Sequence, residues 1–302
     1  MKVISITPRG FCYGVVDAVE MAKQVARDPS VPRPIYILGQ LVHNHHMIER
    51  LAEYGIISLD NTASRLDLLD SIDHGTVIFT AHGVSPQVKE KARAKGLHCV
   101  DTTCPDVQKT HDLIRQLAAQ GYQILFIGRK GHPEPEGALG EAPGQVHLVQ
   151  DESDLAALDL PATAKIAVTT QTTLSRWDTE ALIARIRERY PGIEVYTEIC
   201  QATQLRQEAA VRQSAEADVV FVVGDVRSSN SNRLVDVVRD QARKPVYLID
   251  SVRDIRPEML AGARTVAVTA GSSTPSDITR EVIRFLQQYD PEHPVLPPST
   301  SP

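Results

Sequence analysis

The chain has 302 residues, of which 42% are hydrophobic and 23% are charged, and its formal net charge is −6. Such a chain is long enough to bury one large α/β domain or two to three small ones. The acidic balance argues against a nucleic-acid binder that works by bulk electrostatics, and from the hydropathy pattern we expect neither a transmembrane span nor a signal peptide. We therefore expect a cytoplasmic protein without nucleic-acid or membrane partners.

Twelve apolar runs of strand length alternate with longer segments of helical period. Most of the runs are continuous and rich in Val and Ile, as expected for strands that helices cover on both faces. The alternation predicts α/β structure with mostly parallel sheets. The predicted strands are residues 2–6, 34–38, 56–59, 76–80, 97–100, 123–127, 145–149, 165–169, 193–197, 218–223, 245–249 and 264–269.

Three of the four cysteines occupy equivalent places in this alternation. Cys12, Cys104 and Cys200 each follow a predicted strand and stand at the start of a helical segment, at nearly equal intervals. A single cysteine is most often a core residue, and this is our interpretation of Cys99, which lies inside a strand. A reducing compartment disfavours disulfides, and the cysteines are too scattered for a zinc ribbon.

Polar loops repeat with the same period as the cysteines. They predict three pseudo-symmetric α/β domains of about four strands each, at residues 1–103, 104–199 and 200–287, followed by a poorly ordered tail at 288–302. Because functional groups gather at the carboxyl ends of parallel strands, we expect these loops and the cysteines to converge on one cavity. The first loop of each domain carries His43, His132 or Ser228, and the second carries His82, Thr172 or Ser273.

The cysteines suggest a metal centre. The N–H groups exposed at a helix start favour thiolates, and three thiolates can hold either zinc or an iron–sulfur cluster. A 4Fe–4S cluster with three cysteine ligands leaves one iron open to a substrate, whereas the usual electron-transfer cluster has four cysteine ligands. The spacing alone does not separate zinc from iron.

Two loops indicate what else the cavity would do. The turn GHPEPEG contains His132 and Glu134, and a carboxyl in a closed cavity can donate protons, although a solvated surface loop is the simpler reading. The segment RSSN can bind an anion at a helix start, although ordinary capping explains it too. Without a Walker loop or a dinucleotide fingerprint, a diphosphate is the expected anion. Its candidate ligands are Ser228, Ser229, Asn230, Ser273, His43 and His82.

Nine motifs in order resemble one family. The 4-hydroxy-3-methylbut-2-enyl diphosphate reductases, the last enzymes of the methylerythritol phosphate route to isoprenoids, share them over about the first 280 residues. The resemblance implies an oxygen-sensitive enzyme with three α/β domains in a trefoil around one 4Fe–4S cluster. The motifs read PRGFCYGV, HN, TAHGVS, DTTCPDV, GHPEPEG, QTTLS, EIC, RSSNSNRL and TAGSSTP.

The resemblance also implies residue roles. Cys12, Cys104 and Cys200 would ligate three irons, and the open fourth iron would bind the substrate hydroxyl. Glu134 would supply protons for its reductive removal, giving isopentenyl and dimethylallyl diphosphate. Thr172 and His132 would act with it in catalysis by orienting the hydroxyl or relaying the protons. A ferredoxin or flavodoxin would deliver single electrons. The substrate would be bound by His43, His82, His132, Thr172, Ser228, Ser229, Asn230 and Ser273.

The loop around Glu134 departs from the usual family pattern. Pro135 replaces an aliphatic residue, and residues 138–141 differ from the usual Thr-Met-Gly-Gln, so we expect a stiffer loop with different partners. Two other functions stay open at this point. One is a cluster-dependent dehydratase without net reduction, and the other is a zinc-stabilised or redox-sensing binding protein.

Overall fold

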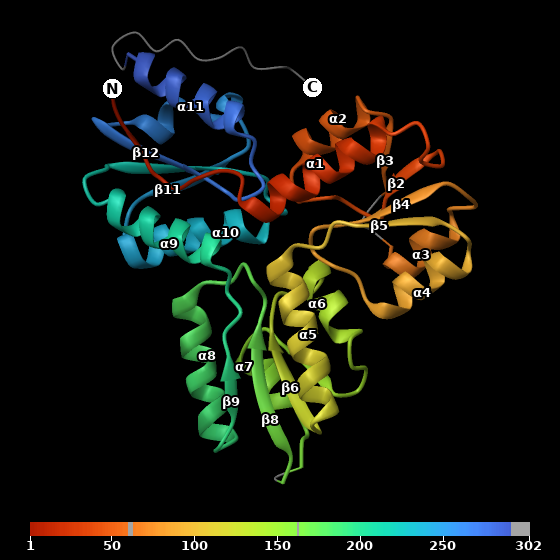
Figure 1. Ribbon diagram of the computed structural model, residues 1–302. Coiled ribbons are helices and arrows are strands. Elements are labelled where there is room, and N and C mark those ends of the chain that lie inside the picture. The colour runs from red at the N-terminus through yellow and green to blue at the C-terminus, as the bar shows by residue number, and fades with distance from the viewer. Residues whose placement is uncertain (60–62, 162, 291–302) are drawn as a thin grey trace. The chain divides into compact units, whose positions relative to one another are not determined.

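The computed structural model describes residues 1–59, 63–161 and 163–290. Within these ranges the strands form three four-stranded sheets, in which every neighbouring pair is parallel (Figure 1). None of the helices in the same ranges is long and apolar enough to span a bilayer. Most of the predicted tail, residues 291–302, lies outside the described residues.

The chain divides into two compact units, and each is described by itself. The first unit contains Met1–Tyr13, His43–His46 and the residues from Gln201 onward. The second unit contains Gly14–Val42 and Met47–Cys200. The first unit therefore holds one of the three sheets, and the second holds two.

The sheet of the first unit has the order β1-β12-β10-β11. Along β10, Val219, Phe221 and Val223 pack on the face covered by α11. Val220 and Val222 pack on the opposite face against α9 and α10, so both faces of the strand are buried. Burying each of these side chains contributes about 1.5–3 kcal/mol. The elements are β1 (Lys2–Ser5), α9 (Gln201–Gln213), β10 (Val219–Val223), α10 (Ser229–Val237), a π-helical turn (Val238–Ala242), β11 (Val246–Ile249), 3₁₀ turns (Val252–Asp254 and Pro257–Leu260), β12 (Thr265–Ala270) and α11 (Ser276–Gln288).

One sheet of the second unit has the order β3-β2-β4-β5. Helices α3 and α4 cover one of its faces with Leu69, Val88 and Ala92. Helices α1 and α2 lie on the other side of these strands in Figure 1. The elements are α1 (Tyr13–Arg27), β2 (Ile35–Ile37), α2 (His45–Ala52), β3 (Ile56–Ser58), α3 (Arg65–Asp70), β4 (Thr76–Phe79), α4 (Pro86–Ala94) and β5 (His98–Asp101).

The other sheet of the second unit has the order β7-β6-β8-β9. Helices α5 and α6 pack on one face through Ile114, Leu117 and Ala138, and α7 and α8 pack on the other. A proline at the first turn of both α5 and α6 costs no hydrogen bond there. The elements are α5 (Pro105–Ala119), β6 (Tyr122–Ile127), α6 (Pro133–Leu139), β7 (Val146–Val149), α7 (Glu152–Ala157), β8 (Lys165–Thr170), α8 (Arg176–Arg189) and β9 (Glu194–Tyr196).

All three sheets share one strand order, second-first-third-fourth, once β1 is counted as the fourth strand after β10, β11 and β12. The predicted first domain placed the strand at residues 2–6 together with the strands up to residue 100. In the structure β1 pairs instead with β12, with Val3 opposite Val266. The predicted boundaries at 103, 199 and 287 stay predictions. Each of the three candidate cysteines thus follows the fourth strand of a sheet.

The shared order also fixes where the polar loops lie. In each sheet the first strand lies between the second and the third, so chain connections leave in opposite directions at the ends of the first and third strands. Ligands of open parallel sheets bind at such switch points. The loops after β2, β6 and β10 and after β4, β8 and β12 are the six predicted from the sequence.

Candidate functional site

The three candidate cysteines are half-buried, and each is held through its backbone N–H. The N–H of Cys104 donates to the Ala81 carbonyl at 3.0 Å, and that of Cys200 donates to the Thr172 carbonyl at 3.0 Å. In the first unit, the N–H of Cys12 lies 3.3 Å from the Ser272 carbonyl. Each cysteine is therefore fixed to the loop after the third strand of a sheet.

Space around the Cys104 thiol depends on Gly14, near the start of α1. A Cβ atom added at Gly14 would overlap the Sγ atom of Cys104. Any other residue would displace the sulfur or the helix. The glycine in the motif CYGV thus leaves room for a thiol that is distant in the sequence.

Glu134 is a buried carboxyl in the second unit. It lies in the first turn of α6 and is 2% exposed. Thr172 holds both carboxylate oxygens, because its N–H donates to Oε1 at 2.7 Å and its hydroxyl donates to Oε2 at 3.1 Å. Burial raises the pKa of Glu134 to about 7, although both bonds from Thr172 act in the opposite direction. The carboxyl is therefore poised to exchange a proton near neutral pH.

Two histidines extend this group. The Nδ1 atom of His132 accepts the N–H of Glu134 at 3.2 Å and caps α6. The edge of the His132 ring meets the His82 ring at a centroid distance of 5.2 Å. His82 follows Ala81, which binds Cys104, so these contacts form a connected set within one unit. Its members are Cys104, His82, His132, Glu134, Thr172 and Cys200.

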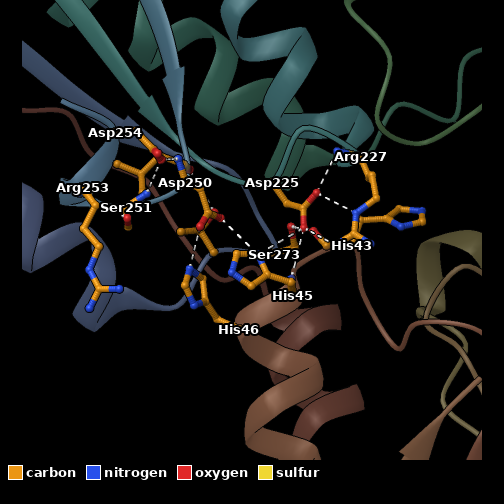
Figure 2. Close-up of polar contacts among 12 residues, drawn as sticks. His43, His45, His46, Asp225, Arg227, Asp250, Ser251, Arg253, Asp254 and Ser273 are labelled. Carbon is orange, nitrogen blue, oxygen red and sulfur yellow. Dashed lines mark hydrogen bonds and ion pairs between the residues drawn. The ribbon is translucent and has the colours of Figure 1, made fainter. Parts of the chain in front are cut away.

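The first unit gathers a second set of predicted residues around the start of α10. The Ser228 hydroxyl caps this helix by accepting the N–H of Ser231 at 3.3 Å. The Ser273 hydroxyl donates to the His43 carbonyl at 3.0 Å and lies 3.4 Å from the Ser228 hydroxyl. Ser273 and His43 are neighbours in Figure 2. Ser229, the first residue of α10, is 3% exposed.

Asn230 connects the start of α10 to Cys12. Its Oδ1 atom accepts the N–H of Ser272 at 2.8 Å, and Ser272 in turn accepts the N–H of Cys12. Its amide nitrogen lies 3.4 Å from the Thr203 hydroxyl. The first unit therefore joins one candidate cysteine to the candidate anion-binding loop.

Sequence reasoning missed Arg206, which is 5% exposed on α9. Its guanidinium donates to the Gly10 carbonyl at 2.8 and 3.1 Å and to the Phe11 carbonyl at 3.1 Å. It thus fixes the two residues before Cys12. The only sequence signal is an arginine six residues after Cys200 in a helical segment, and nothing in that pattern predicts its burial.

The unusual loop residue Glu141 has a buried carboxylate, which pairs with one buried and one exposed side chain. Its carboxylate lies 2.7 Å from Nδ1 of His111 and 2.5 Å from Nη1 of Arg115, both on α5. Arg65 contacts Glu136 in the same loop region at 2.5 Å. These ion pairs tie the segment that carries Glu134 to neighbouring helices, and a change of partners relative to other family members stays a prediction.

Known proteins resemble the chain over nearly its full length. A family model described as "LytB protein" matches residues 3–287. The 4-hydroxy-3-methylbut-2-enyl diphosphate reductase of Symbiobacterium thermophilum is 59% identical, over 97% of this chain and 99% of its own. The protein of the same name from Anoxybacillus flavithermus is 55% identical, over 97% and 93%.

Solved structures agree with this resemblance. The structure of the E-1-hydroxy-2-methyl-but-2-enyl-4-diphosphate reductase from Plasmodium falciparum superposes with a TM-score of 0.88 at 32% identity, covering 98% of this chain and 94% of its own. A structure of (E)-4-hydroxy-3-methyl-but-2-enyl diphosphate reductase, described as the terminal enzyme of the non-mevalonate pathway, gives 0.66 at 29% identity. That match covers 95% of this chain and 100% of the other.

Proposed function

Because this chain belongs to the LytB protein family, we propose that it is a 4-hydroxy-3-methylbut-2-enyl diphosphate reductase of the non-mevalonate pathway, acting in the cytoplasm. The reaction removes the substrate hydroxyl as water with two electrons and two protons, giving isopentenyl or dimethylallyl diphosphate. One observation carries the assignment of the acid. Glu134 is a buried carboxyl with a pKa of about 7, held by the same threonine that fixes Cys200.

We assign Cys12, Cys104 and Cys200 as the ligands of one 4Fe–4S cluster. The donor set fits, because thiolates are the usual cluster ligands and each thiol stands at a helix start. The room that Gly14 leaves around the Cys104 thiol supports the role of this cysteine as a ligand. When bound, the cluster supplies electrons and one coordination position without a protein ligand.

Glu134 delivers protons through Oε2. Its Oε1 atom receives a backbone N–H, which can only donate, so a protonated carboxyl carries its proton on Oε2. The Thr172 hydroxyl at Oε2 then turns from donor to acceptor. This hydroxyl can orient the leaving group or relay the proton to it. His132, bound to the Glu134 N–H through Nδ1, holds the start of α6 in place and carries its neutral-state proton on Nε2.

The start of α10 supplies the anion site for the diphosphate. Its N–H groups and the hydroxyls of Ser228, Ser229 and Ser273 favour phosphate oxygens at this helix N-terminus. Asn230 adds its amide, and His43, His82 and His132 add charge when they are protonated. Electrons come singly from a ferredoxin or flavodoxin, because the sequence has no dinucleotide fingerprint.

Anaerobic purification tests this function. We expect about four irons and four sulfides per chain, and oxidation of two equivalents of reduced viologen for each product formed. Water loss without electron consumption would instead indicate a dehydratase. A colourless protein that contains one zinc and no sulfide would overturn the proposal in favour of a zinc-stabilised binding protein.

A further inference from the structure

A cluster of imidazoles and carboxylates in the first unit lies outside the residues assigned above. His45 and His46 begin α2, and Asp250 directly follows β11 (Figure 2). The Nε2 atom of His46 lies 3.0 Å from one oxygen of Asp250, and Nδ1 of His45 lies 3.4 Å from the other. One ligand atom from each of the three residues lies within 4.8 Å of the others.

The surroundings of Asp250 favour a cation. Burial raises the pKa of Asp250, and the charge of Asp254 adds to that effect, whereas the two histidines oppose it. The Oδ1 atom of Asp250 is shielded from solvent and has no hydrogen bond in the described part of the chain. The His45 ring nitrogen lies 3.4 Å from it, and Oδ1 retains lone pairs for a metal ion.

The neighbouring carboxylate is already neutralised. Arg227 donates to both oxygens of Asp225, at 3.0 and 2.7 Å. Asp225 also accepts the backbone N–H of His45 at 3.1 Å, and so it fixes the start of α2. Its Oδ2 atom also lies 3.7 Å from Nδ1 of His45, so Asp225 holds both the backbone and the ring of His45 in position beside Asp250.

We propose that His45, His46 and Asp250 form a binding site for a borderline divalent cation of the Zn²⁺ class. Zinc binds imidazole nitrogen and carboxylate oxygen at about 2.0–2.2 Å, so adjacent ligands in a tetrahedron are about 3.3 Å apart. The Nε2 atom of His46 lies at about this spacing, 3.0 Å, from one oxygen of Asp250, and Nδ1 of His45 lies 3.4 Å from the other; one carboxylate oxygen lies within 4.8 Å of both nitrogens. Water completes the fourth position, because the His45 side chain is 41% exposed.

The ion has a structural consequence within the first unit. It joins the segment His43–His46 to the end of β11 and so reinforces the contact between the His43 carbonyl and Ser273. The two nitrogen ligands select against Mg²⁺ and Ca²⁺, which prefer oxygen. This inference does not depend on the proposed reaction.

Zinc binding to the anaerobic, cluster-loaded protein tests the site. Equilibrium dialysis against Zn²⁺ and metal analysis should find one zinc per chain in addition to the cluster. Asp250→Asn and His46→Gln should each weaken binding at least tenfold, with iron content unchanged. The control His74→Gln, at an exposed histidine of the second unit, should bind as the wild type does.

Zinc X-ray absorption separates this site from the cysteines without relying on a variant. The expected spectrum has imidazole scattering and only nitrogen and oxygen neighbours. Sulfur neighbours would place the zinc at the thiols and overturn the proposal. The proposal would also be overturned if both ligand variants bound zinc with wild-type affinity, or if the wild-type protein bound no zinc. Equal affinity of the wild-type protein for Mg²⁺ and Zn²⁺ would overturn it as well.

Discussion

Replacing Glu134 with Gln removes a proton donor and leaves its shape almost unchanged. The amide oxygen can still accept the Thr172 N–H that now binds Oε1. Loss of a general acid typically lowers rates 10²–10⁴-fold, which corresponds to about 3–5 kcal/mol of transition-state stabilisation. We therefore expect kcat to fall by that factor in a viologen-coupled assay, while cluster content stays at the wild-type level.

The same substitution should change stability in a pH-dependent way. The pKa of Glu134 rises from 4.5 to about 7 on folding, mainly through burial. Below pH 4.5 the carboxyl is protonated in both the folded and unfolded states, so its stability contribution is fully present. That contribution is lost as the pH rises from 4.5 through about 7. Above this range the buried charge lowers the free energy of unfolding by about 3 kcal/mol. Gln cannot ionise and avoids this cost.

Anaerobic thermal unfolding at pH 5 and pH 8 measures this effect. The Gln variant should unfold about 5–10 °C above the wild type at pH 8, with a much smaller difference at pH 5. Glu134→Asp is the matched control, because it keeps an ionisable acid and should retain part of the activity. Turnover of Glu134→Gln within threefold of the wild type would remove Glu134 from catalysis. A stability difference independent of pH would refute its raised pKa.

Four further substitutions test the metal centre and its support. Cys104→Ser should lose most of the iron, whereas Cys99→Ser in β5 should keep it; equal losses would show that the ligands are wrongly chosen. Gly14→Ala should lower the iron content, because the added Cβ atom would overlap the sulfur of Cys104. Alanine itself stabilises a helix relative to glycine by up to about 1 kcal/mol. Full iron content in this variant would therefore contradict the steric argument. Glu141→Gln should reduce the free energy of unfolding at pH 7 by about 1–3 kcal/mol, because the buried His111 loses a charged partner. The pKa of Glu141 is lowered despite its burial, because His111 and Arg115 stabilise the carboxylate. The loss of unfolding free energy should therefore shrink as the pH falls below 4.5. A loss that does not depend on pH, measured by urea unfolding, would contradict this prediction.

The strands could be predicted from the sequence because strands that are buried on both faces consist of continuous runs of apolar residues. The run at 218–223 is continuous and apolar, and β10 occupies Val219–Val223 with every residue buried. Each of the other predicted runs likewise overlaps a strand of the described residues, within one residue at either end. The parallel α/β architecture with three four-stranded sheets is therefore confirmed.

Long-range partners could not be predicted in the same way. Pairing of Val3 with Val266 depends on contacts across almost the whole chain, and no local pattern reports it. The ion pair between Glu141 and His111 depends similarly on how α5 packs beside α6. The contacts of His45 and His46 could not be predicted either, because their carboxylate partner follows a strand that is distant in the sequence.

The three sheets share a strand order, but their equivalent loops differ in chemistry. The loop after β10 places hydroxyls and an amide at a helix start, which suits a fixed anion. The equivalent loop after β6 places Glu134 at a helix start, where ionisation would normally be favoured. Burial outweighs that preference and keeps the carboxyl near its protonated state. A repeated backbone thus supplies equivalent buried positions, and the side chains placed there decide which loop holds an anion and which one donates a proton.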